Sequence, residues 1–265
     1  MAEKLILATS SAEAASRKNV SCAFLAGGTE INRLNSTVNA RTLISIGRIG
    51  ELDGISKADG MVRIGAMTTF QEMLDSRLVP EYLKEACRFM GSRTKRNMAT
   101  IGGNVALRRT DSYIYATLIA CHAKLELLSR KGENLTRCVC CYLKKHDEFR
   151  NHLILAVSVP EKAVVVSKRY ANTVQSHAVL TVAMGNVDGN FRLAVAAKDT
   201  VLKSLCDIAE KLSDKDLSDD EILALVKADP DLKFKSDIYG SPQYKRYLLS
   251  VTIADLAKKV KGGRR

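Results

Sequence analysis

Tryptophan is absent from the 265-residue sequence, and proline and aromatic residues are scarce, with four prolines and an aromatic content of 5%. No run of about 18 to 20 consecutive apolar residues occurs, which excludes an ordinary membrane-spanning helix. Residues 1–7 are followed by polar residues before an apolar stretch of signal-peptide length accumulates. Because 46% of the residues are hydrophobic and 26% are charged, we expect a folded, cytoplasmic protein.

The seven cysteines are odd in number and scattered, which does not suggest a secreted disulfide framework. Cys138, Cys140 and Cys141 form the one cluster, and they could be interpreted as one corner of a metal or iron–sulfur site. A four-thiolate site needs a second nearby cluster, which the sequence lacks. Buried or edge-strand thiols are therefore favoured, and we predict no metal site.

The formal net charge of +12 would attract polyanions, and residues 258–265 concentrate that charge at the carboxy terminus. A nucleic-acid-binding protein is therefore one alternative. Against it, no motif interleaves aromatic rings with basic residues, and zinc-finger spacing is absent. A solvated, frayed tail is the favoured interpretation, and we expect neither nucleic acid nor membrane as a partner.

Two nucleotide-binding fingerprints are also missing, since neither Gly-x-Gly-x-x-Gly nor a P-loop occurs. Two glycine pairs are present instead, in Ala26-Gly27-Gly28-Thr29-Glu30 and Thr100-Ile101-Gly102-Gly103-Asn104. Glycine pairs let a ligand approach main-chain amides closely, and phosphates exploit this geometry. Taken singly, each pair is more often a tight turn than a cofactor site.

The apolar pattern predicts a mixture of helices and strands. We expect a strand over 21–26, a helix over 29–34 after the first glycine pair, and a central strand over 153–159. From residue 163 the pattern predicts an antiparallel meander followed by helices, beginning with one over 201–212. This change of pattern indicates a domain boundary near residue 163.

Residues 24–31 and 96–104, which contain the glycine pairs, resemble the paired FAD-binding segments of the flavoprotein subunits of xanthine dehydrogenase and carbon monoxide dehydrogenase. The order and separation of the two segments also match. Further similar stretches cover residues 43–52, 62–69 and 236–248. The resemblance extends over nearly the whole chain and points to the FAD-binding (medium) subunits of the molybdenum hydroxylase family.

The resemblance implies an α+β fold, with a two-subdomain FAD-binding domain of the PCMH or vanillyl-alcohol-oxidase-like type. It implies that this domain covers residues 1–162, with subdomains of about 1–53 and 54–162. A small carboxy-terminal domain like that of carbon monoxide dehydrogenase flavoprotein, with a three-stranded antiparallel sheet and helices, would then cover residues 163–265.

The resemblance also implies which residues contact FAD. The two glycine loops would line the diphosphate and ribityl region from opposite sides, Leu153 and Ile154 would touch the flavin or adenine, and Lys168 would be a basic contact. The full set is Leu25, Ala26, Gly27, Gly28, Thr29, Glu30, Ile31, Thr100, Gly103, Asn104, Ala106, Asp111, Leu153, Ile154 and Lys168.

The second loop departs from the family after its Gly-Gly-Asn. The family commonly continues Ile-Ala-x-Ala-Ser-Pro-x-x-Asp, whereas an ungapped comparison here places Tyr113 at the acidic position. One alternative is that Asp111 takes over after a local shift. The other is that a polar FAD contact is lost and the guanidinium of Arg108 or Arg109 compensates at phosphate.

In the family, FAD accepts electrons from iron–sulfur clusters and passes them to NAD⁺ or another acceptor. The resemblance thus implies two partners, a molybdenum-cofactor-binding large subunit and a small subunit with two [2Fe-2S] clusters. A purine substrate of the xanthine type is one expectation for the complex. No catalytic residue is predicted in this chain, because its four histidines lack a nucleophile motif. A degenerate assembly module that no longer binds FAD is the remaining alternative.

Overall fold

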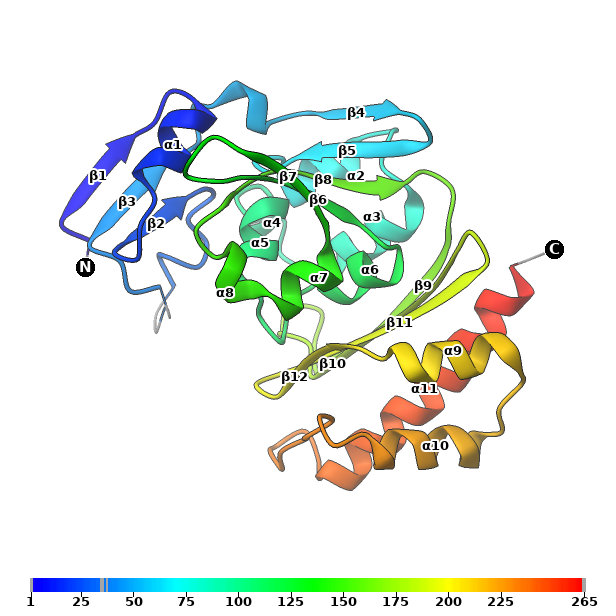
Figure 1. Ribbon diagram of the computed structural model, residues 1–265. Coiled ribbons are helices and arrows are strands. Elements are labelled where there is room, and N and C mark those ends of the chain that lie inside the picture. Colours follow the sequence, from blue (N-terminus) through cyan, green and yellow to red (C-terminus); the bar gives the residue numbers. More distant parts are fainter. Residues whose placement is uncertain (1, 34–35, 37, 264–265) are drawn as a thin grey trace. The chain divides into compact units, whose positions relative to one another are not determined.

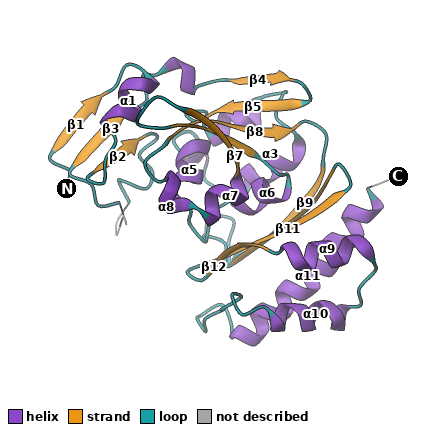
Figure 2. Cartoon of the chain, in the orientation of Figure 1, coloured by secondary structure: helices purple, strands orange, loops and turns teal. Residues whose placement is uncertain are grey.

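The computed structural model describes residues 2–33, 36 and 38–263, and these residues form two compact units (Figure 1). The first unit comprises the described residues of Met1–Val79, Ser92–Leu107 and Ala123–Glu161. The second comprises those of Pro80–Gly91, Arg108–His122 and Lys162–Arg265. Both units combine helices with strands (Figure 2), which confirms the predicted α+β class.

A three-stranded parallel sheet opens the first unit. Its strands are β1 (Lys4–Leu7), β3 (Thr42–Ser45) and β2 (Cys22–Leu25), in that order. The predicted strand over 21–26 is therefore confirmed as β2. The sheet packs against α1 (Ser11–Arg17), and buried Ile44 on the central strand lies in the shared hydrophobic cluster.

The second sheet of this unit has five antiparallel strands. They are β4 (Ile55–Ala58), β5 (Met61–Gly65), β8 (Leu153–Pro160), β6 (Lys124–Leu128) and β7 (Asn134–Cys138), in spatial order. The expected central strand over 153–159 is confirmed, because β8 occupies the middle of the sheet. Every residue of β8 is buried or half-buried, so both faces of this strand are covered, which explains why β8 is apolar almost throughout.

Short helices complete the first unit. They are η1 (Gly50–Leu52), α2 (Phe70–Asp75), α4 (Arg93–Arg96), α5 (Ile101–Leu107), α7 (Val139–Lys144) and α8 (His146–Phe149). Helix α2 begins with a complete capping box, since Thr69 and Glu72 each accept a main-chain N–H of the other. Such reciprocal caps satisfy donors that a helix start leaves open.

The second unit is built on a four-stranded antiparallel sheet. Its strands follow the order β12 (Val201–Ser204), β11 (Asn190–Ala197), β10 (Leu180–Val187) and β9 (Val164–Tyr170). The predicted meander is thus confirmed, and β10 and β11 are joined by a two-residue turn in which Asp188 and Gly189 both have positive φ.

Strand β12 corrects two sequence-based expectations, the helix over 201–212 and a sheet of only three strands. Residues 201–204 pair with β11, from Val201 opposite Ala197 to Ser204 opposite Ala194. The helix begins later, as α9 (Cys206–Asp214). The physical reason is tertiary contact. Residues 201–204 have a helical pattern in the sequence, but pairing with β11 and burial of Val201 favour the strand.

Helices cover the two faces of this sheet within the second unit. One face packs against α9 and α11 (Pro242–Gly262), while α10 (Asp219–Ala228) packs on α11, and the side chains of Leu180, Val182 and Met184 lie in that core. The alternate residues of β10 face α6 (Tyr115–Ala120). An ideal Cβ at Gly185 would lie only 2.4 Å from the carbonyl oxygen of Ala120, so glycine permits this close approach. Helix α3 (Glu81–Arg88) contacts β9 and α6.

Candidate functional site

The first glycine loop follows strand β2 and contains two positions that require glycine. An ideal Cβ at Gly27 would lie 1.6 Å from the carbonyl oxygen of Met98, far inside van der Waals contact. Gly28 has a φ of 71°, in the left-handed region that favours glycine. Gly27 therefore permits two backbone segments to approach each other, and Gly28 permits the turn itself.

The main chain of this loop has N–H groups to offer to a ligand. Among the described residues, those of Ala26, Gly27, Gly28 and Thr29 donate no hydrogen bond within the protein. The first three residues are half-buried and Thr29 is exposed, so a ligand can reach them. Successive N–H groups in a glycine turn can bind an anion, and phosphate is the anion that most often uses such turns. The loop can therefore offer these N–H groups to an anion such as phosphate.

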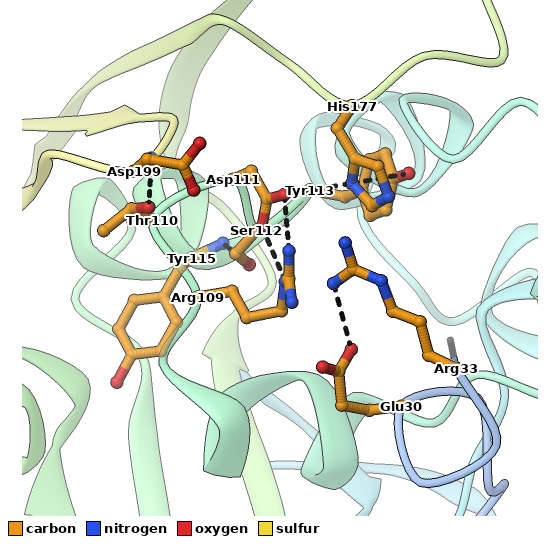
Figure 3. Close-up of polar contacts among 10 residues, drawn as sticks. All are labelled: Glu30, Arg33, Arg109, Thr110, Asp111, Ser112, Tyr113, Tyr115, His177 and Asp199. Carbon is orange, nitrogen blue, oxygen red and sulfur yellow. Dashed lines mark hydrogen bonds and ion pairs between the residues drawn. The ribbon is translucent and has the colours of Figure 1, made fainter. Parts of the chain in front are cut away.

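The helix predicted over 29–34 is wrong for the described residues 29–33, which form turns, and Leu34 lies outside the described residues. One hydrogen bond of helical spacing is present, from the N–H of Asn32 to the carbonyl of Gly28 at 3.0 Å. Glu30 and Arg33 form an ion pair at 3.6 Å (Figure 3). A short helix is stable only when an apolar face packs against the protein. Among residues 29–33 only Glu30 and Ile31 are partly buried, so this segment lacks such a face and does not form a helix.

The second glycine loop differs from the first because its N–H groups are used within the protein. Those of Ile101 and Gly102 bind the carbonyls of Thr68 and Ala66, at 3.0 and 2.9 Å. The N–H of Gly103 donates to Oγ1 of Thr100 at 3.2 Å. These bonds start helix α5 and fix it beside β5. The second loop is therefore a rigid support rather than a second set of open donors.

The two loops lie together in the first unit. Gly27 abuts the carbonyl of Met98, and an ideal Cβ at Gly103 would lie 3.9 Å from Cβ of Ala26. The sequence-predicted stretches 25–31 and 100–104 are thus neighbours. The carbonyl of Met98 is the partner that sequence reasoning missed, because a main-chain contact leaves no signal in a side-chain pattern.

The remaining predicted residues of the first unit are placed differently. Ala106 is exposed on α5, and Asn104, two residues earlier, is half-buried. Leu153 and Ile154, at the start of β8, are only 1% and 5% exposed. Leu153 belongs to the hydrophobic cluster around β3 and α1. Both leucine and isoleucine side chains are thus enclosed by the unit itself.

In the second unit, the altered segment that follows the second loop forms a compact ionic cluster. The carboxylate of Asp111 accepts two hydrogen bonds from Arg109, from Nε to Oδ1 and from Nη2 to Oδ2, each at 2.7 Å (Figure 3). Nδ1 of His177 lies 3.2 Å from Oδ2 of the same carboxylate. The Asp111 side chain is only 3% exposed, so its charge is compensated at close range.

Tyr113 extends this cluster, because its hydroxyl lies 3.4 Å from Nδ1 of His177. His177 is far from Asp111 along the chain, so the sequence carries no signal of their contact. Arg108 precedes the cluster with a φ of 47°. Its Nε is buried and has no hydrogen-bond partner among the described residues. Of Arg108 and Arg109, Arg108 is therefore the one whose Nε–H group has no acceptor among the described residues.

Lys168, the predicted basic contact, lies on β9 in the second unit. Its Nζ is 3.9 Å from Oδ2 of Asp255 and 5.4 Å from the centre of the Tyr170 ring. The side chain is 46% exposed, so its ammonium group remains accessible to solvent and to a ligand.

A buried lysine supports the strand that precedes the first glycine loop. Nζ of Lys18 donates to the carbonyl of Cys22 at 2.7 Å and lies 5.8 Å from the ring centre of Phe24. Burial lowers the pKa of Lys18, with smaller contributions from nearby charges. The main-chain carbonyl and the ring face compensate the charge and tie α1 to β2, which carries the loop.

Two features, a metal-binding cluster and a membrane-spanning helix, are absent from the described residues 2–33, 36 and 38–263. No group of three or more histidine, cysteine or acidic side chains there is arranged to hold a metal ion. None of the helices in that part is both long enough and apolar enough to cross a bilayer.

The chain is similar to several known proteins. Residues 3–162 match the family described as FAD binding domain in molybdopterin dehydrogenase. The uncharacterized protein YgfM of Escherichia coli strain K12 is 31% identical over 243 residues, covering 88% of this chain and 85% of that protein. The xanthine dehydrogenase FAD-binding subunit of Escherichia coli O157:H7 is 32% identical over 120 residues, covering 43% and 41%.

Among solved structures, a chain of the reconstituted carbon monoxide dehydrogenase from Oligotropha carboxidovorans has a TM-score of 0.83 at 19% identity, covering 99% of this chain and 98% of that chain. This likeness shows the fold. The family match spans more than half of the chain, and it includes both glycine loops. The chain therefore belongs to the family of FAD-binding domains of molybdopterin dehydrogenases, the medium subunits of molybdenum hydroxylases, and FAD is its cofactor.

Proposed function

We propose that this chain is the electron-transfer subunit of a heteromeric molybdenum-dependent hydroxylase. The observation that carries the proposal is the first glycine loop, which offers N–H groups of residues 26–29 and is held in place by Met98. In a member of this family, a diphosphate is the natural ligand for such a loop.

FAD, when bound, supplies a group that exchanges electrons both singly and in pairs, which suits a junction between iron–sulfur clusters and a two-electron acceptor. The chain's own residues bind and orient it. In the proposed site, residues 25–31 hold the diphosphate and ribityl region, and Thr100 and Gly103 keep that loop in position. Asn104 and Ala106 on α5 are further proposed contacts, and because they are two residues apart in a helix they would reach the cofactor from different sides of α5.

Two basic side chains of the second unit are candidate phosphate contacts. Lys168 retains an accessible ammonium group, and Arg108 has an uncommitted Nε, so either can attract a phosphate. Asp111 would act through Arg109, which it orients, rather than as a direct acceptor. Leu153 and Ile154 would support the site through the core around strand β8, because both side chains are buried within the unit.

We further propose that residues 1–162 form the FAD-binding domain, with subdomains of about 1–53 and 54–162, and that residues 163–265 form the smaller domain. The family match, which ends at residue 162, supports this division. The partners would be a molybdenum-cofactor-binding large subunit and a small subunit with two [2Fe-2S] clusters, in a cytoplasmic complex. The similarity to a xanthine dehydrogenase subunit supports a purine substrate. NAD⁺ is the electron acceptor that we propose from the family resemblance.

One observation favours a second candidate, an assembly module that no longer binds FAD. The carboxylate of Asp111 is fully engaged by Arg109 and His177, so it does not offer a free acceptor to a cofactor. The open N–H groups of the first loop argue for retained binding, because nothing else in the described chain uses them.

Purification of a tagged chain from its native host tests the proposal. We expect yellow protein that releases FAD on denaturation and that co-purifies with a molybdenum-cofactor subunit and a two-cluster iron–sulfur subunit. Colourless protein that still brings down both subunits would support the assembly module instead. If neither subunit co-purifies, the proposed complex is wrong.

A further inference from the structure

Two cysteines at the start of helix α7 have no role in the proposed function. Cys138 ends the edge strand β7, and Cys141 lies in the first turn of α7 (Figure 1). Their Sγ atoms are 2.8 Å apart, within hydrogen-bonding distance. The Sγ of Cys138 also accepts a hydrogen bond from the main-chain N–H of Cys141 at 3.1 Å. The main chain and the two thiols together hold the sulfur atoms side by side.

Packing of the same helix fixes this arrangement. Val139 and Tyr142 are 0% and 2% exposed, and the Tyr142 ring stacks on Phe149 with 6.1 Å between ring centres. Residues three apart share a helix face, so burial of Val139 and Tyr142 leaves Cys138 and Cys141 on an adjacent face. Cys141 is exposed and Cys138 is half-buried, which lets a small reagent reach the pair.

The geometry is close to that of a disulfide without yet being one. A disulfide bond is about 2.05 Å long, so the sulfur atoms need to approach by only about 0.8 Å from their 2.8 Å separation. Pairs spaced Cys-x-x-Cys at a helix start commonly undergo reversible oxidation. Cys140 lies between the two in the sequence and is half-buried.

We propose that Cys138 and Cys141 form a reversible intramolecular disulfide by exchange with a small disulfide of the glutathione class. The thiolate of the exposed Cys141 attacks one sulfur of that disulfide, and one small thiolate leaves. Sγ of Cys138 then attacks Sγ of Cys141 in the mixed disulfide, and the second small thiolate leaves. The protein pair loses two electrons and two protons, and the small disulfide is reduced to two thiols.

The proton balance of the pair sets the pH dependence of this exchange. The hydrogen bond with Cys138 raises the pKa of the Cys141 thiol, and burial adds to the effect, whereas the charge of Lys144 opposes it. Only the thiolate attacks, so formation of the disulfide should accelerate with rising pH through the neutral and mildly alkaline range.

Mass spectrometry of the full chain tests the proposal directly. The chain is equilibrated with reduced and oxidised glutathione, quenched with acid, alkylated and digested with trypsin, which releases residues 138–144 as one peptide. We expect this peptide to be two hydrogens lighter and to carry one alkylated cysteine. Exposed Cys206 lies on a separate tryptic peptide and serves as an internal reference that can only form a mixed disulfide.

At one glutathione ratio, we expect the pair to be oxidised at least about ten-fold more than Cys206, because the second sulfur attacks within the same molecule. Cys140→Ser should retain the cross-link. Cys138→Ser should instead trap glutathione on Cys141, and Cys141→Ser should abolish both products. If residues 138–144 are oxidised no more than Cys206, or if Cys140→Ser removes the cross-link, the proposal is overturned.

Discussion

Substitution of Gly27 by alanine gives a direct test of how the first glycine loop is held. The added Cβ would lie 1.6 Å from the carbonyl oxygen of Met98 and 2.7 Å from its carbonyl carbon. Close carbon–oxygen contacts settle at about 3.3 to 3.6 Å, so the two backbones must separate by roughly 1.7 Å. Neither partner is the flexible end of a side chain, so the loop itself has to move.

The size of the effect follows from the cost of overpacking. Such an insertion typically costs about 1–3 kcal/mol. If that cost is expressed in ligand binding, the Kd for FAD rises by about five-fold to 150-fold. If the free chain absorbs it instead, the free energy of unfolding falls by the same amount. Both quantities are measurable, by quenching of flavin fluorescence and by urea unfolding.

Gly50→Ala is the matched control, because no atom lies within 4 Å of its ideal Cβ and it belongs to the same unit. It should change neither quantity appreciably. Gly28→Ala offers a second route to the same loop, since its φ of 71° costs an L-residue about 1–2 kcal/mol. A folded Gly27→Ala chain whose affinity for FAD and free energy of unfolding are both unchanged would refute the reasoning.

Two further predictions concern charged groups. Asp111→Asn leaves the Arg109 guanidinium facing a neutral amide, so it should lower the free energy of unfolding by about 1–3 kcal/mol in urea titrations. Asp216 is exposed, so Asp216→Asn should lower the free energy of unfolding far less. Equal effects of the two substitutions would contradict the role of burial. A hydrogen bond from the Ser218 main-chain N–H, with help from neighbouring groups, lowers the pKa of Glu221 from 4.5 to about 2. The ionised Glu221 carboxylate therefore stabilises the folded chain above pH 4.5, and this stabilisation is lost as the pH falls towards about 2. Glu221→Gln should accordingly lower Tm at neutral pH and leave it unchanged below pH 2. A Tm difference that persists in acid would show that the cap does not depend on charge.

Local chemistry made several elements predictable from the sequence. The capping box at Ser218 needs only four consecutive residues, and the structure contains both of its hydrogen bonds. The strand over 153–159 lies between β5 and β6 and is buried or half-buried throughout. Its apolar run can be recognised in the sequence without knowledge of those neighbouring strands.

Contacts between distant segments could not be predicted in the same way. Strand β12 exists because β11 offers a free edge, which no local pattern of residues 201–204 reveals. The cluster of Asp111 and His177 joins two segments far apart in the chain. At the candidate site, the two glycine loops and their order could be recognised in the sequence. The sequence could not show that the N–H groups of the second loop are occupied, because this depends on the carbonyls of Thr68 and Ala66, which bind only that loop.

Titration of the FAD-free chain with FAD and with riboflavin tests the central claim most directly. Both ligands carry the flavin ring, but only FAD carries the diphosphate that residues 26–29 are proposed to hold. The account predicts that FAD binds at least about 100-fold more tightly, a difference of about 2.7 kcal/mol, and that Gly27→Ala removes most of this preference. Equal affinity for the two flavins, or no binding of FAD by folded protein, would contradict it.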